Sequence, residues 1–257
     1  LANLQVIQSN NEISISDKLE GMHFSVEMET GTGKTYVYIR SIYELNKLYG
    51  FKKFVIVVPS VAIREGVLKN LEITHEHFQN LYENVPVNFQ VYDSTKVSTL
   101  RGFATTNNIE VLVINIDSFA KDENVINKPN DKLTGQKPVE FIQATNPIVI
   151  VDEPQNMETE KRITAIANLQ ALCTLRYSAT HRNQYNLTYS LNPVKAYDLG
   201  LVKQIEVDSI IEENAYNDAF VSVESITAAK TKVTAKVSIN SNENGGVKKK
   251  TLTVKVG

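Results

Sequence analysis

The sequence has one cysteine, no tryptophan and no long apolar run among its 257 residues. The single cysteine, Cys173, cannot form an internal disulfide, which is typical of a reducing compartment. The apolar runs, such as residues 54–58 and 148–151, have five residues or fewer, whereas a bilayer span needs about 20. No basic-then-apolar leader opens the chain, so nothing in it argues for secretion. These absences predict a cytoplasmic protein with no membrane partner.

An excess of charge of either sign is also lacking. Lys and Arg number 27 against 29 Asp and Glu, a net charge of −2, so the composition indicates no nucleic-acid partner beyond a local one. The 42% hydrophobic and 22% charged residues are ordinary for a globular protein and exclude disordered and collagen-like chains. The length predicts one large domain or two small ones. Because the chain begins with Leu1 rather than Met, we expect a fragment.

Short apolar runs alternate with longer amphipathic stretches between about residues 20 and 180. Strands are predicted over residues 23–28, 54–58, 87–92, 111–116, 148–151 and 172–177. Helices are predicted over residues 34–49, 61–71 and 75–82. This alternation predicts an α/β fold in which helices cover both faces of a parallel sheet. Residues 121–140 break the pattern, and we interpret them as a solvated surface excursion rather than a functional or mobile loop.

The pattern changes after about Leu201. Apolar and polar residues alternate over 232–239 and 251–256, and the Asn-Glu-Asn-Gly-Gly turn at residues 242–246 joins them, so an antiparallel hairpin is predicted. Residues 230–257 hold seven lysines against one acid, Glu243. These lysines either grip DNA phosphates or protect edge strands from sheet-to-sheet association, and the pattern favours neither.

A glycine-rich segment lies between the first predicted strand and the first long helix. The residues expected to hold ATP are Thr30, Gly31, Thr32, Gly33, Lys34 and Thr35. Its two glycines let successive N–H groups point at phosphate oxygens, and the helix that follows adds its positive N-terminal end. Lys34 is expected to reach the β- and γ-phosphates and Thr35 to bind Mg²⁺. Met28 replaces the first glycine of the usual pattern, and a coincidental turn is the alternative.

An acidic pair, Asp152 and Glu153, follows the predicted strand 148–151. The carboxyl end of a buried parallel strand is where open α/β sheets bind ligands. We expect Asp152 to hold Mg²⁺, through water, and Glu153 to orient or deprotonate the attacking water. Pro154 is expected to restrict Glu153 to extended geometry. Alone, such a pair also fits ordinary carboxylates at a strand end.

A third element follows the predicted strand 172–177. It consists of Ser178, Ala179, Thr180 and His181. Its small hydroxyl side chains can hydrogen-bond the acidic pair and a neighbouring domain, although by itself the segment reads as a turn.

Together these three elements resemble motifs I, II and III of superfamily-two helicases, a class of DEAD-like ATPases. The Asp-Glu-Pro-Gln form of the second motif, the segment 57–67 and the Tyr-Val-Tyr at 36–38 resemble the restriction (Res) subunit of type III restriction–modification enzymes. The resemblance covers about residues 20–210. It implies a P-loop NTPase fold of RecA-like type followed by an antiparallel β-rich segment.

The same resemblance implies that the chain is divided into three parts. These are a lead-in at 1–20, the first RecA-like helicase domain at 21–190, and a linker with the incomplete start of a β-rich region at 191–257. It also implies roles for individual residues. Lys34, Asp152 and Glu153 would be catalytic, with Thr35 and Asp152 at Mg²⁺; Ser178, Ala179, Thr180 and His181 would couple ATP to DNA; Ser60 and Arg64 would contact DNA phosphates. For Arg64 the alternative is an exposed helix charge.

The implied function is a motor domain in which ATP hydrolysis drives translocation on double-stranded DNA. A methyltransferase (Mod) subunit would read the recognition sequence, and a domain absent from this chain would cut. We expect the isolated fragment to hydrolyse ATP weakly and to lack nuclease activity. Adenine contacts are not located, and Gln5 and Gln8 are considered. The alternatives are another superfamily-two helicase or remodeller acting on DNA or RNA, and an ATP-controlled scaffold.

Overall fold

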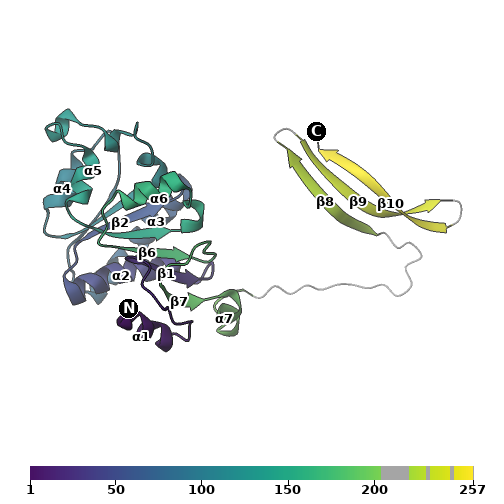
Figure 1. Ribbon diagram of the computed structural model, residues 1–257, viewed down its shortest axis with the longest axis horizontal. Coiled ribbons are helices and arrows are strands. Elements are labelled where there is room, and N and C mark those ends of the chain that lie inside the picture. Colours follow the sequence, from purple (N-terminus) through teal and green to yellow (C-terminus); the bar gives the residue numbers. More distant parts are fainter. Residues whose placement is uncertain (204–219, 230–231, 244–245, 257) are drawn as a thin grey trace. The chain divides into compact units, whose positions relative to one another are not determined.

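The computed structural model describes residues 1–203, 220–229, 232–243 and 246–256. The chain divides into two compact units, Leu1–Gln204 and Ile205–Gly257 (Figure 1). The first unit contains a seven-stranded sheet and the second a three-stranded sheet. Among the described residues, no helix is long and apolar enough to cross a membrane.

The large sheet is parallel at every pair of neighbouring strands, in the order β3-β4-β2-β5-β6-β1-β7. Its strands are β1 (His23–Met28), β2 (Lys53–Val58), β3 (Val87–Val91), β4 (Ile109–Asn115), β5 (Ile148–Asp152), β6 (Cys173–Ser178) and β7 (Leu187–Leu191). The helices are α1 (Ala2–Asn10), α2 (Lys34–Tyr49), α3 (Val61–Leu81), α4 (Thr99–Thr105), α5 (Pro138–Gln143), α6 (Glu160–Ala167) and α7 (Pro193–Asp198). The predicted fold class is therefore confirmed.

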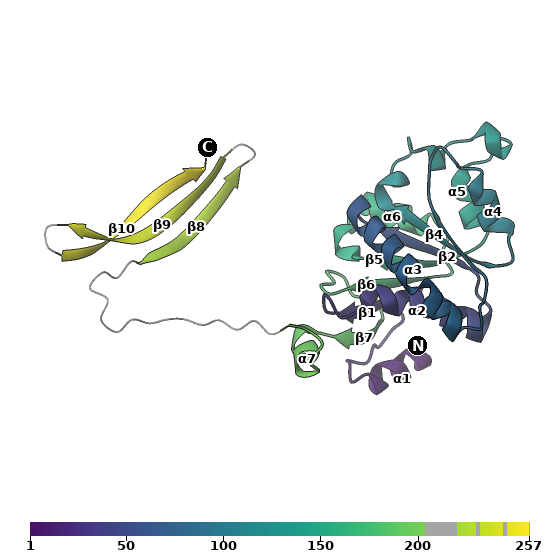
Figure 2. The same cartoon turned by 180° about the vertical axis from the view of Figure 1, so that it is seen from behind.

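Helices cover both faces of this sheet (Figures 1 and 2). Helices α2 and α3 pack on one face, and α4, α5 and α6 on the other. Alternate side chains of the central strands pack into the hydrophobic cores on the two faces. Val55 and Val57 of β2 belong to one core, and Phe54 and Ile56 to the other. This double burial explains why β2, β4 and β5 read as continuous apolar runs rather than as alternating patterns.

Two predictions about this unit are wrong. The expected helices 61–71 and 75–82 form one continuous helix, α3, because no glycine or proline interrupts residues 72–74, and exposed Ile73 only marks its solvent side. Residues 121–140 are not merely a solvated excursion, since Ile126 and Leu133 are fully buried in the core. These two anchors lie in short 3₁₀ turns, η2 (Val125–Asn127) and η3 (Asp131–Leu133), which are too short to give a periodic signal.

The second unit is an antiparallel sheet in the order β10-β9-β8. Its strands are β8 (Val221–Ala229), β9 (Lys232–Glu243) and β10 (Gly246–Val256). The predicted hairpin is confirmed by the pairing of Glu243 with Gly246, while residues 244–245 of the turn and Lys230 lie outside the described residues.

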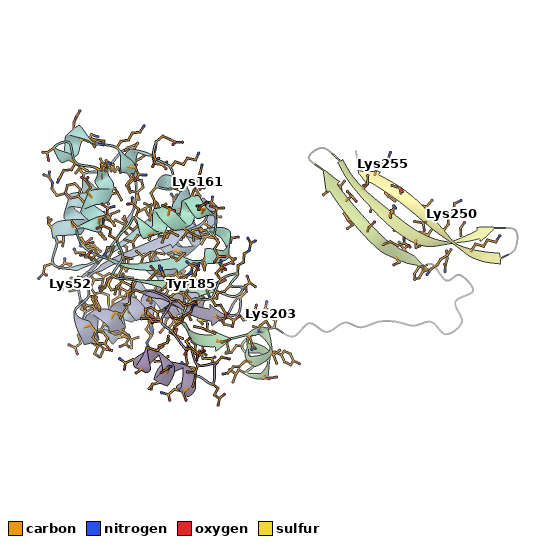
Figure 3. The ribbon with its side chains drawn as sticks, viewed as in Figure 1. Lys52, Lys161, Tyr185, Lys203, Lys250 and Lys255 are labelled. Carbon is orange, nitrogen blue, oxygen red and sulfur yellow. The ribbon has the colours of Figure 1, made fainter. Side chains whose placement is uncertain are left out.

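The register of the second unit separates its lysines. Leu252 and Lys250 alternate with Lys249 and Lys255 along β10, so these two pairs lie on opposite faces of the sheet. Figure 3 labels Lys250 and Lys255 on this strand. The lysine cluster of this segment is therefore divided between an apolar face, which includes Val237, and a polar one.

Candidate active site

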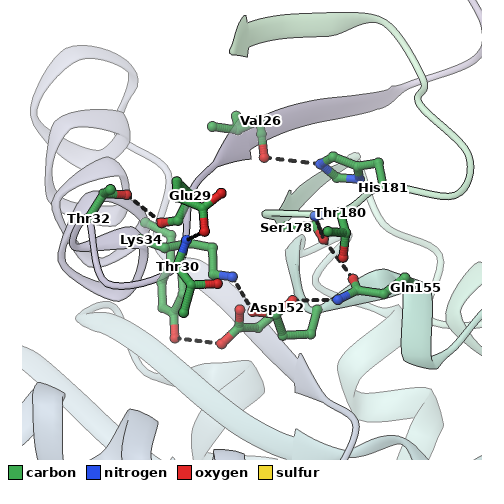
Figure 4. A network of polar contacts seen from close by, with 12 residues as sticks. Val26, Glu29, Thr30, Thr32, Lys34, Asp152, Gln155, Ser178, Thr180 and His181 are labelled. Atoms are coloured by element: carbon green, nitrogen blue, oxygen red, sulfur yellow. Dashed lines mark hydrogen bonds and ion pairs between the residues drawn. The ribbon is translucent and has the colours of Figure 1, made fainter. Parts of the chain in front are cut away.

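The glycine-rich loop joins the carboxyl end of β1 to the start of α2. Gly31 and Gly33 have φ angles of 81° and 91°, in the left-handed region. A Cβ on either would meet nothing within 4 Å, so backbone conformation rather than space requires glycine there. The Thr32 hydroxyl donates to the Glu29 carbonyl at 2.6 Å and closes the loop (Figure 4). Lys34, the first residue of α2, follows directly, so the loop opens at a helix N-terminus, which suits an anion.

Asp152 ends β5 and is 4% exposed. Its Oδ2 accepts a hydrogen bond from the Tyr38 hydroxyl at 3.3 Å, whereas its Oδ1 is buried and has no hydrogen-bond partner among the described residues. Burial raises the pKa of Asp152 to about 6, against the opposing effect of Lys34. A buried carboxylate oxygen that lacks a partner fits a hard cation such as Mg²⁺ or one of its waters.

Glu153 corrects one expectation, because its backbone is left-handed (φ 53°, ψ 55°) rather than extended. Its N–H donates to the Tyr177 carbonyl at 3.0 Å, and its carbonyl accepts from the Asn156 N–H at 3.1 Å. These two bonds hold the peptide on both sides, so the 3₁₀ turn η4 (Pro154–Asn156) starts at once. A left-handed non-glycine residue costs roughly 1–2 kcal/mol, and such strain is concentrated at functional sites.

Side-chain contacts join the three predicted motifs (Figure 4). The Lys34 ammonium forms an ion pair with Oε1 of Glu153. Gln155 donates to Oε2 of Glu153 at 2.6 Å and accepts from the Ser178 hydroxyl at 2.7 Å. The Thr180 N–H donates to the same Ser178 hydroxyl at 2.9 Å. Ser178 therefore reaches the acidic pair through Gln155, not directly.

The segment after β6 also returns to β1. Half-buried Ala179 stands between Ser178 and Thr180, and the His181 ring is hydrogen-bonded to the Val26 carbonyl at 3.1 Å (Figure 4). Burial lowers the pKa of His181, which favours the neutral form of its ring. Motif III is thus attached both to the strand that precedes the loop and to the turn that follows the acidic pair.

Ser60 and Arg64 lie at the start of α3. The Ser60 hydroxyl caps the helix by accepting the Ile63 N–H at 3.3 Å. Arg64 pairs with Glu65 at 2.8 Å and lines an open groove of about 820 Å³ together with Asp117. Among the described residues, no hydrogen bond or ion pair joins Ser60 or Arg64 to Lys34 or Glu153.

The family of the type III restriction enzyme, Res subunit, matches residues 5–183 of this chain. The chain belongs to that family. It is 32% identical over 246 residues to the StyLTI Res subunit of Salmonella typhimurium (strain LT2), which covers 81% of this chain and 25% of that protein. It is 33% identical over 227 residues to the EcoP15I Res subunit of Escherichia coli, covering 79% and 23% of the two chains. It is 34% identical over 202 residues to the EcoPI Res subunit of Escherichia phage P1, covering 70% and 21%.

This Res-family chain therefore spans about a quarter of the length of these curated relatives. The matched residues 5–183 include the glycine-rich loop, the acidic pair and motif III as far as His181. The side-chain amides of Gln5 and Gln8, which were considered as adenine contacts, form hydrogen bonds inside the protein. Both donate to Ser16, and Gln8 also donates to the Leu187 carbonyl of β7 at 2.9 Å.

The sequence does not predict the buried residues that contact the site residues or pack beside them. Tyr38 lies one helical turn after Lys34 and so on the same side of α2, but three other residues of that helix, one tyrosine and two isoleucines, are equally buried. Arg176 and Glu158 form a buried ion pair at 2.8 Å, with side chains 9% and 5% exposed. Glu158 also accepts from the Asn183 amide at 3.0 Å. The spacing along the chain does not reveal this pair, because it forms only in the folded sheet, where Arg176 pairs in register with Val151 of β5 and Glu158 lies six residues after the end of that strand.

Proposed function

We propose that this Res-family domain binds ATP with Mg²⁺ at the carboxyl edge of its parallel sheet and hydrolyses it to drive movement along double-stranded DNA. One observation carries the proposal. A glycine loop that opens at a helix N-terminus lies beside Lys34, Glu153 and a buried carboxylate, Asp152, with one oxygen unpartnered among the described residues. Phosphoryl transfer needs this set: phosphate donors, a metal ligand and a base for water.

Each residue has a definable part in the reaction. The loop N–H groups of residues 30–35 and the Lys34 ammonium bind the phosphates, and Thr35 and Asp152 hold Mg²⁺. When bound there, Mg²⁺ would supply positive charge to offset the charge that develops on the phosphate oxygens. When Lys34 contacts a phosphate oxygen, it leaves Oε1 of Glu153 free to accept a proton from the attacking water. Gln155 keeps the other oxygen of Glu153 in place through its 2.6 Å hydrogen bond.

The other proposed roles follow from the family. Residues 21–190 form the motor domain, with a lead-in at 1–20 and a linker and β-rich region at 191–257. Ser178, Ala179, Thr180 and His181 couple nucleotide to DNA, which is supported by the contact of Ser178 with Gln155. Ser60 and Arg64 contact DNA phosphates, which position DNA without reading its sequence. A methyltransferase (Mod) subunit is the partner that reads the site, and we expect no nuclease activity from residues 1–257.

The test is ATP hydrolysis by the full-length protein with its methyltransferase subunit, measured with no nucleic acid, with duplex DNA and with duplex RNA. We expect stimulation by DNA and loss of at least 100-fold, on the scale of acid–base catalysis, in Glu153→Gln. Lys34→Ala is expected to lose nucleotide affinity as well. Unchanged hydrolysis in Glu153→Gln would favour a scaffold that only binds ATP, and stimulation by RNA alone would refute a DNA motor.

A further inference from the structure

Arg162 of helix α6 bridges two loops at the carboxyl edge of the sheet. Its Nη1 donates to the Asn156 carbonyl at 2.8 Å, and its Nη2 donates to Oδ1 of Asp117 at 2.8 Å. Asn156 ends the η4 turn that follows β5, whereas Asp117 lies in the 3₁₀ turn η1 (Ile116–Ser118) that follows β4. Strands β4 and β5 are not neighbours, because β2 lies between them. The Arg162 side chain therefore links the turns after β4 and β5 across the carboxyl end of β2.

The bridge ends in the turn of Glu153 on one side. The Asn156 N–H donates to the Glu153 carbonyl at 3.1 Å, so the peptide that Arg162 binds belongs to the same short turn as Glu153. The left-handed backbone of Glu153 is a strained conformation, and a change in its side-chain contacts with Lys34 and Gln155 would act on that turn.

On the other side the bridge ends at the groove that Arg64 lines. Asp117 lines the same groove. The Asp117 N–H donates to Oδ1 of Asn115 at 2.9 Å, and its carbonyl accepts from the Asn124 amide at 3.2 Å. These bonds connect Asp117 to Asn124, which lines the same groove, so a shift of Asp117 with the Arg162 guanidinium acts on the wall of the groove.

This bridge is exposed, which separates it from the structural contacts of the fold. The side chains of Arg162 and Asp117 are 30% and 64% exposed. Exposed ion pairs contribute little to folding stability. The planar guanidinium can donate in two directions at once with fixed geometry, which a lysine ammonium at the end of a flexible chain does not reproduce.

We propose that Arg162 is a positioning residue that couples the Glu153 turn to the groove lined by Arg64 and Asp117. Through it, the state of the nucleotide site changes the affinity of that groove for DNA phosphates, and DNA changes the affinity for ATP. This inference rests on the function proposed above. Coupling between two sites is reciprocal, so both changes have the same size.

The experiment compares Arg162→Gln with Lys161→Gln, an exposed neighbour on the same helix (Figure 3), in the full-length protein. Duplex DNA affinity is measured with and without a non-hydrolysable ATP analogue, and analogue affinity with and without DNA. The coupling factor is the ratio in each pair. We expect Arg162→Gln to reduce this factor about fivefold in both directions, on the scale of typical coupling energies. The melting temperature and the affinity for the analogue alone should not change, and Lys161→Gln should match the wild type.

Asp117→Asn should reduce the coupling factor as Arg162→Gln does, and the double variant should lose no more than either single one. A full coupling factor in folded Arg162→Gln would overturn the inference while leaving the motor function intact. Absence of any coupling, and of any DNA-stimulated hydrolysis, in the wild type would overturn the proposed function and this inference together.

Discussion

Removing Glu158 should destabilise the chain through the charge that it leaves behind on Arg176. The two side chains form an ion pair at 2.8 Å and are only 5% and 9% exposed, and Nε of Arg176 has no hydrogen-bond partner within the described part of the chain. In Glu158→Ala the guanidinium stays charged, since arginine does not deprotonate in proteins. It keeps one favourable contact, the Tyr185 ring at 4.9 Å.

The size of the effect can be estimated from these contacts. Breaking a buried ion pair by removing one partner costs about 3–5 kcal/mol. The Tyr185 ring contact persists, and a cation–π contact is worth about 0.5–2 kcal/mol, so the lower end of that range is expected. For a domain of this size each 1 kcal/mol lowers the melting temperature by about 2–4 °C, so a loss of about 3 kcal/mol corresponds to about 6–12 °C.

Urea and thermal unfolding followed by circular dichroism measure this loss. The control is Glu72→Ala, which breaks the exposed Lys69–Glu72 pair (3.7 Å, side chains 69% and 76% exposed) and should cost at most a few tenths of a kcal/mol. The double variant Arg176→Met/Glu158→Leu should recover most of the stability, because an apolar pair leaves no buried charge. A Glu158→Ala variant within about 1 kcal/mol of the wild type, at the level of an exposed pair, would refute the reasoning.

Two further predictions concern Asp152. Tyr38→Phe removes the hydroxyl that donates to Asp152 and should weaken Mg²⁺-dependent ATP binding about tenfold, as expected for a hydrogen bond to a charged group. The control Tyr43→Phe, on the same helix, removes a hydroxyl that has no partner among the described residues and should leave binding unchanged. Titration calorimetry measures ATP binding in both variants. Asp152→Asn should abolish hydrolysis yet stabilise the fold above pH 6. Because burial raises the pKa of Asp152 from 3.8 to about 6, the folded state binds the extra proton more tightly than the unfolded state does. The free energy of unfolding of the wild type therefore falls by about 3 kcal/mol as the pH rises from about 4 to 6. In urea unfolding at pH 3.5, the stabilising effect of Asp152→Asn should be absent.

The parts of the fold that the sequence predicts are those with a strong local pattern. Strands β2, β4 and β5 are continuous apolar runs because both of their faces are buried, and α2 begins and ends at glycines with left-handed backbones, Gly33 and Gly50. Strand β7 and helix α1 were not predicted. Strand β7 is only half-buried and polar at Thr188 and Ser190, and α1 is held by Gln8, a side chain that reads as solvent-facing.

The site divides in the same way. Asp152 and Ser178 each follow a predicted strand, and Lys34 begins the helix after the loop that follows the first predicted strand, so their meeting at one edge is predictable from parallel pairing alone. The left-handed backbone of Glu153 was not predictable, because Pro154 favours an extended residue before it and only the contacts with Tyr177 and Asn156 oppose that preference. Pairs such as Arg162 with Asp117 depend on tertiary distance, and no spacing along the chain marks them.

The polar network depends on an aromatic contact on the other face of the sheet. In β6, Tyr177 points toward α2, where its ring lies 5.5 Å from that of Tyr38, while Ser178 points to the opposite face and meets Gln155. The register of the sheet pairs Asp152 with Tyr177. Since side chains alternate along a strand, a slip of one residue would move Tyr177 to the opposite face of the sheet and turn Ser178 toward α2. Burial of one tyrosine, 3% exposed, thus holds the serine that links the acidic pair to motif III.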